Sequence, residues 1–174
     1  SYDACHEVIE QMLAAGSESA VHICGVIAEL QLDRYADRVI GLLENPHASV
    51  RVAATVCLGK LRRLETVEML LSRLTAADLE LQRATAQALA DMGPGAVPAL
   101  REKLAGSSPN VWKTSMLALV QLMPDEEVKT DLVEQSVLKL TELEQLAKLP
   151  AAYRQLGRED LAMLAEMRVH DVRA

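Results

Sequence analysis

The stretch VRVAATVCLGKL at residues 50–61 carries a helical pattern that recurs along this chain. Similar segments begin at Leu81 and Val111, and a weaker copy begins at Ser19, so the four copies are spaced 31, 31 and 30 residues apart. Each copy places apolar residues at the i, i+3 and i+4 positions that share one face of a helix. A fixed period of about 30 residues filled with helices is typical of a helical solenoid.

The composition favours an all-α domain over a β-rich one. Half of the 174 residues are hydrophobic, yet the chain has no Phe, one Trp and three Tyr. Its core must therefore consist mainly of Leu, Val, Ile, Met and Ala, whereas β domains are usually richer in aromatic residues. The sequence also has no alternating strand pattern and no Asn-Gly or Asp-Gly hairpin signal.

Turn residues divide the chain into pairs of helices. Asn45-Pro46 and Gly93-Pro94-Gly95 are examples of these breaks. The intervening segments predict four pairs, namely 3–15 with 18–31, 34–44 with 48–62, 65–74 with 78–92, and 95–105 with 109–123.

Local signals support these boundaries. Asp33 and Asp78 are suited to accept hydrogen bonds at helix starts, and Ser108-Pro109 combines a cap with a first-turn proline. Small residues inside the helices predict close helix–helix approaches, which we place at Ala53, Ala54, Ala84 and Ala88.

The repeat pattern fades after residue 124. We therefore expect a solenoid over residues 1–124 and a helical C-terminal cap over 125–174, within the same domain. Residues 126–144 have helical character, Pro150 interrupts the chain, and 158–167 predict a last amphipathic helix with Leu161, Met163, Leu164 and Met167 on its apolar side. An alternative is that this segment covers the binding groove and inhibits it.

The motif VRxAAxxxLGxL at residues 50–61 resembles the second helix of a HEAT repeat, in the short bacterial variant named after phycobilisome lyases. Residues 66–74, 81–89 and 96–104 are similar to other parts of that repeat, and the resemblance covers roughly residues 3–123. It implies a right-handed, armadillo-like α-solenoid of about four helical hairpins. The chain departs from the family at its small-residue positions, where it has His22, Thr114 and Val120.

The resemblance implies that the second helices line a concave face. Arg51, Arg83 and Lys113 would place positive charge on this face of a protein whose net charge is −7. Trp112, Met116 and Leu117 would supply apolar anchors, and an aromatic side chain beside a cation is typical of an interface hot spot. Arg51 could instead be a scaffold residue that bonds a neighbouring turn, and the C-terminal segment could cover the three anchors.

Charge and hydropathy exclude several classes of function. A net charge of −7 argues against a duplex nucleic-acid-binding protein, which normally carries a basic stripe. The apolar runs are far shorter than the roughly 20 residues of a membrane span, so no membrane insertion is expected. We see no signal peptide, and three cysteines without a pairing framework indicate reduced thiols and a cytoplasmic location.

The sequence predicts no catalytic residue, no metal ligand set and no cofactor. His6-Glu7 is the one His-Glu pair, and a metal site needs about four converging ligands. No nucleophilic triad pattern, phosphate loop or dinucleotide fingerprint is present.

These inferences favour a non-enzymatic scaffold or adaptor that binds a protein or peptide segment, with an acidic flank, in its concave groove. An alternative is a non-catalytic subunit or domain of a modifying enzyme, such as a phycobilisome-type chromophore lyase. A second alternative is a structural spacer or oligomerisation segment. The oligomeric state is left open by the sequence.

Overall fold

The computed structural model describes residues 2–75, 77–103, 108–123, 150–151, 153–154 and 157–173. All regular secondary structure in these ranges is helical, as predicted for an all-α chain. The chain forms two compact units, Ser1–Ala96 and Val97–Ala174. The domain boundary predicted at residue 124 lies beside residues outside the described ranges and stays a prediction.

The first unit consists of three consecutive helical pairs. Their bounds are α1 (Tyr2–Ala14), α2 (Glu18–Glu29), α3 (Ala36–Gly41), α4 (Ala48–Lys60), α5 (Val67–Ser72) and α6 (Leu79–Asp91). Short 3-10 turns flank the first helices of the pairs, namely Asp33–Tyr35, Leu42–Glu44, Leu64–Thr66 and Pro94–Ala96. Because of these turns, α3 and α5 are shorter than the segments predicted from the sequence.

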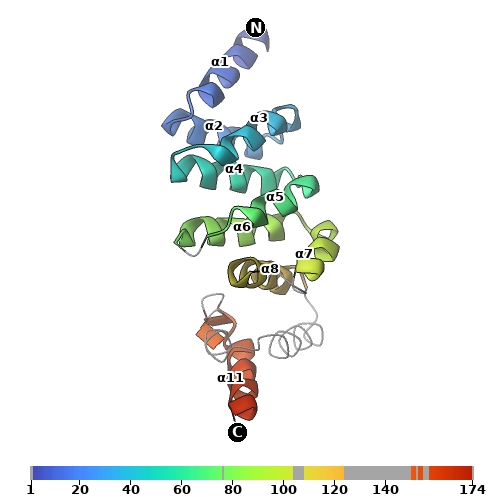
Figure 1. The fold of residues 1–174 in the computed structure, drawn as a ribbon. Helices are drawn as coiled ribbons and strands as arrows, with labels where there is room; N and C mark the ends of the chain where they lie inside the picture. The colour runs from blue at the N-terminus through green and yellow to red at the C-terminus, as the bar shows by residue number, and fades with distance from the viewer. Residues whose placement is uncertain are drawn as a thin grey trace. The chain divides into compact units, whose positions relative to one another are not determined.

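The second helices of these pairs pack against one another in chain order. Helix α4 contacts α2 on one side and α6 on the other, and Figure 1 shows the three helices in succession. Helix α4 therefore buries two flanks. The core residues of α4 include Val50, Ala54, Cys57 and Leu58, as the repeat pattern predicted.

The turns after these second helices share a backbone conformation. Gln31, Arg62 and Gly93 all have positive φ, at 52°, 55° and 81°, and they follow one another at intervals of 31 residues. The amide after Gln31 donates to the carbonyl of Ile27, and the equivalent Arg63 amide donates to Leu58. These are the bonds of a left-handed helix cap, for which glycine is the usual residue.

Helices α4 and α6 approach each other closely at a glycine. A Cβ atom built on Gly59 would lie 2.5 Å from the Cα of Ala88, so no side chain fits there without backbone movement. Ala54 and Ala88 are buried, as predicted for close approaches. Ala53 and Ala84 are half-buried, and Ala53 lines a pocket together with residues of α2, so their predicted place at close helix approaches stays a prediction.

Asp78 confirms its predicted role as a helix cap, since its carboxylate accepts a hydrogen bond of 2.9 Å from the amide of Leu81. Asp33 starts the first 3-10 turn, but its side chain does not cap it. Its carboxylate instead accepts two hydrogen bonds of 3.1 Å from Arg63, one repeat further along the chain. This ion pair links the turns of successive repeats.

The second unit contains α7 (Val97–Lys103), α8 (Pro109–Leu122) and α11 (Glu159–Arg173) among its described residues. Helix α7 packs against α8, which begins with Pro109 in its first turn as predicted. Helix α11 covers the predicted segment 158–167 and continues beyond it.

The predicted apolar side of this last helix is partly wrong. Its buried positions include Leu161, Ala162 and Ala165, whereas Met163 and Met167 are exposed, because two alanines complete the packed face. Pro150 lies in helical backbone, and the predicted helix at 126–144 lies outside the described residues.

Candidate functional site

Arg51 has a clear structural role at the start of α4. Its guanidinium donates to the carbonyl oxygens of Asn45 and Pro46, at 2.9 and 3.0 Å, in the turn before the helix. It also lies 3.4 Å from the carboxylate of Asp78, which caps α6. These contacts agree with the scaffold interpretation of Arg51, because its guanidinium already binds groups within the chain.

Arg83 lies on the exposed side of α6, as expected for a residue that faces a partner. It forms no hydrogen bond or ion pair with another described residue, and Gln87, one turn later, donates a hydrogen bond to Asp91. Arg83 is therefore the cation of the predicted set that the first unit presents to solvent.

The residues predicted as apolar anchors belong to α8 in the second unit. Trp112 is 9% exposed and Met116 is 0% exposed, while Leu117 and Lys113 are half-buried. Trp112 and Met116 are therefore not open to solvent in this conformation. Their contribution to binding stays a prediction that requires them to become exposed. The Trp112 Nε1 group is buried and has no hydrogen-bond partner among the described residues.

One position of the second helices is buried in every copy of the repeat. Its residues Cys24, Thr55 and Ala86 recur at the repeat period, and all three are buried. Met116 follows them in the sequence pattern, and it is buried as well. Since α4 also packs against both α2 and α6, only a narrow strip of it remains outward.

That outward strip repeats along α2, α4 and α6. Its residues are half-buried or exposed and are listed by helix as Val21 and Gly25, then Val52 and Val56, then Arg83 and Gln87. Valine and glycine dominate its first two helices, and polar side chains dominate the third. The strip thus changes from apolar to polar and basic toward α6.

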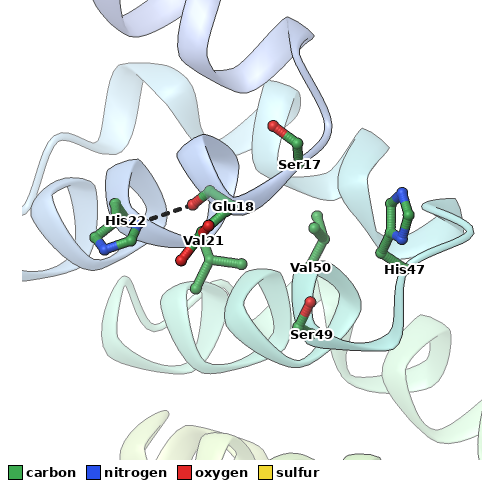
Figure 2. Close-up of a pocket in the computed structure, with 7 residues that line it drawn as sticks. All are labelled: Ser17, Glu18, Val21, His22, His47, Ser49 and Val50. Carbon is green, nitrogen blue, oxygen red and sulfur yellow. Dashed lines mark hydrogen bonds between the residues drawn. The ribbon is translucent and has the colours of Figure 1, made fainter.

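Two pockets adjoin each other between α2 and α4. The first has a volume of about 400 Å³ and the residues Ser17, Glu18, Val21, His22, His47, Ser49 and Val50 line it. Figure 2 shows Val21 of α2 and Val50 of α4 with the polar side chains around them. The His22 Nδ1 atom lies 2.9 Å from the carbonyl oxygen of Glu18, which holds the ring at the rim.

The second pocket shares Val21 and Ser49 with the first and has a volume of about 340 Å³. Its lining is mostly small and apolar, and it includes Cys24, Gly25, Ala28, Val52, Ala53, Val56 and Cys57. Lys60 and Glu80 are its charged residues. We call the two adjoining pockets the α2–α4 groove. Sequence reasoning missed it because no single motif marks it.

A further apolar pocket lies where α1 meets α2 and the following turn. Val8 and Val26 are 52% and 42% exposed, and Leu30 is 64% exposed. These three residues line the pocket together with Ile9 and Tyr35, among others. We call this surface the end face. The positions that match Val26 and Leu30 in the next repeat are Cys57 and Leu61, and both are buried there.

His6 lies at the edge of the end face and is engaged there. Its Nδ1 atom is 2.8 Å from the hydroxyl of Tyr35 and 3.4 Å from the guanidinium of Arg34. Within the described ranges, no three His, Cys, Asp or Glu side chains converge as they would around a metal ion. The same part of the chain holds no helix that is long and apolar enough to cross a membrane.

Comparison with known proteins returns no match: no family model, no curated protein and no solved structure is significantly similar to this chain. The resemblance to HEAT repeats therefore rests on the motif at residues 50–61 and its copies.

Proposed function

We propose that this chain is a non-enzymatic protein-interaction module, an α-solenoid of HEAT-like hairpins that binds a segment of a partner protein in the α2–α4 groove. The observation that carries this proposal is the groove itself, which combines a floor of valine, alanine and glycine with a polar rim. Apolar grooves between helices commonly accept an extended or helical segment from another protein.

The shape and charge of the groove define the chemistry of the partner. Gly25 and Ala53 leave room for a backbone or a small apolar side chain close to the helices. Arg83 lies one repeat beyond Val52 on the same strip and is exposed. The partner segment accordingly carries small apolar residues with an acidic residue toward its α6 end.

Peptides selected from a random display library against the full chain test this proposal. We expect a shared apolar motif with an acidic flank, whose binding is strongly weakened by Val52→Glu, since that change places a charge on the groove floor. The matched control is Val8→Glu, which introduces the same charge on the exposed end face. Both variants must melt cooperatively before their affinities are compared.

The acidic flank has its own test. Arg83→Glu should weaken the selected peptide, and replacement of its acidic residue with lysine should restore affinity for that variant. Equal binding by wild type, Val52→Glu and Arg83→Glu would overturn the placement of the site in the α2–α4 groove.

The end face favours a second candidate function, that of an assembly segment. Val8, Val26 and Leu30 expose apolar surface where interior repeats are covered by their neighbours. Exposed apolar surfaces of this kind often mark interfaces. Light scattering would then report a concentration-dependent oligomer that the Val26→Glu/Leu30→Glu double variant converts to a monomer, and a wild-type monomer at all concentrations would exclude this candidate.

A further inference from the structure

Two of the three cysteines meet beneath the α2–α4 groove. Cys24 belongs to α2 and Cys57 to α4, the neighbouring helix, and each residue is 1% exposed. Both residues line one pocket, and the neighbouring thiol is the largest influence on the pKa of each. The pair is formed between repeats, since the two residues are separated by the 31-residue period and about half a helical turn.

The pair lies against the groove despite its burial. Both cysteines line the pocket of about 340 Å³, together with Gly25, Ala28 and Ala53. These three residues carry short side chains or none, so few atoms separate the cysteines from the pocket. The pocket has room for a reagent of the size of hydrogen peroxide, which we therefore take as the oxidant.

This mutual influence also differentiates the two thiols. It lowers the pKa of Cys24, because the Cys57 thiol stabilises the Cys24 thiolate, and burial opposes this effect. The same interaction and burial raise the pKa of Cys57, while Lys60 acts in the opposite direction. One sulfur is thus favoured as the nucleophile and the other keeps its proton, as in reactive dithiol pairs.

We propose that Cys24 and Cys57 form a reversible dithiol–disulfide site that is oxidised by peroxide and ties the first repeat to the second. The Cys24 thiolate attacks one peroxide oxygen, the O–O bond breaks, and sulfenic acid forms as the departing hydroxide takes up a proton to become water. The Cys57 sulfur then attacks the Cys24 sulfur and loses its proton, and a second water leaves. The pair loses two electrons, and hydrogen peroxide gains them.

The disulfide would cross-link α2 to α4 directly under the groove. A cross-link between repeats restricts the unfolded chain and the opening of the helix pair, so oxidation should raise the melting temperature. This inference does not depend on a protein partner for the groove, and its test requires none.

The cleanest test uses the full chain with Cys5→Ser. This substitution removes the exposed third thiol, and it is needed because Cys5 and Cys24 lie in one tryptic peptide, residues 1–34. Cys57 lies in another, residues 52–60. After peroxide, we expect the intact mass to fall by two hydrogens, the two peptides to appear linked, and dithiothreitol to reverse both changes.

Two further variants separate this site from general thiol oxidation. Adding Cys24→Ala or Cys57→Ala to the Cys5→Ser background should abolish the two-hydrogen loss, the linked peptide and the rise in melting temperature. The proposal is overturned if peroxide-treated Cys5→Ser protein, once unfolded, still has both thiols free to alkylation. Sulfinic or sulfonic acids on separate peptides, with no linked product, would overturn it equally.

Discussion

The interface between α2 and α4 and the interface between α4 and α6 use the same repeat positions with different side chains. The α4–α6 interface places Gly59 against Ala88, and the glycine lets the two backbones touch. The α2–α4 interface has Ala28 at the position of Gly59 and Cys57 at the position of Ala88. Ala28 therefore adds a methyl group relative to Gly59, and Cys57 adds a sulfur atom relative to Ala88. A groove lies at the surface of this α2–α4 interface. A few atoms at two repeat positions thus distinguish a closely packed interface from one that has a groove at its surface.

The largest effect should come from adding a methyl group at the closely packed α4–α6 interface. We expect Gly59→Ala to destabilise the chain by about 3 kcal/mol, because the new Cβ meets the Ala88 backbone, which cannot rotate away. Denaturant unfolding measures the change. The natural Ala28 provides the comparison, and Ala28→Gly should cost only about 1 kcal/mol. Equal effects at the two positions would mean that both interfaces have the same spacing.

The next effect concerns Arg51, which supports the α4–α6 side through the turn at Asn45 and the Asp78 carboxylate. Arg51→Ala should lower the free energy of unfolding by about 2 kcal/mol, since it removes hydrogen bonds from a charged, partly buried donor. The control is Arg38→Ala, whose side chain is 67% exposed in its ion pair with Glu10 and should matter little. A loss of peptide binding without loss of stability would instead assign Arg51 to the partner site.

A smaller change, an increase in the free energy of unfolding, is expected at the turns that follow α4 and α6. The turn after α6 has Gly93, but the equivalent turn after α4 has Arg62 at a φ of 55°. Arg62→Gly should stabilise the chain by about 1 kcal/mol, because glycine occupies this left-handed conformation without the steric penalty. Arg62→Ala keeps the penalty and serves as the control, so stabilisation by both variants would point to charge rather than backbone conformation.

The smallest effect tests the openness of the groove at Gly25. No atom lies within 4 Å of a Cβ built at this position, in contrast to Gly59. Gly25→Ala should therefore stabilise α2 by about 0.5–1 kcal/mol through its higher helix propensity. In thermal unfolding, Gly25→Ala should raise the melting temperature and Gly59→Ala should lower it. A destabilised Gly25→Ala variant would show that the space above α2 is filled.

The repeat period predicted the helices of the first unit well, because a 31-residue spacing of apolar positions fixes both their order and their buried side. It also placed Val50, Cys57 and Leu58 in the core correctly. Ala53 and Ala84 are only half-buried, and a small side chain suits a partly exposed strip as well as a helix contact, so the repeat pattern alone does not fix their burial. The left-handed turns at Gln31 and Arg62 could not be predicted, since neither residue is one that normally marks such a turn.

The candidate site was less accessible to sequence reasoning than the fold. Arg83 lies on an exposed strip as expected, whereas Trp112 and Met116 are buried, so their role as anchors stays a prediction. The amphipathic pattern of a helix does not show whether one side of it is buried or two. A helix packed between two neighbours, such as α4, is buried on two sides. The contact of Cys24 with Cys57 depends on the packing of separate helices, which no local spacing encodes.

Photo-cross-linking tests the central claim most directly. A peptide selected against the full chain, with a photoreactive group within its apolar motif, would be irradiated in the complex and the linked residues identified by mass spectrometry. The account predicts cross-links within α2 and α4, at the strip of Val21, Gly25, Val52 and Val56. Cross-links confined to α8, or to the end face around Val8 and Leu30, would contradict it.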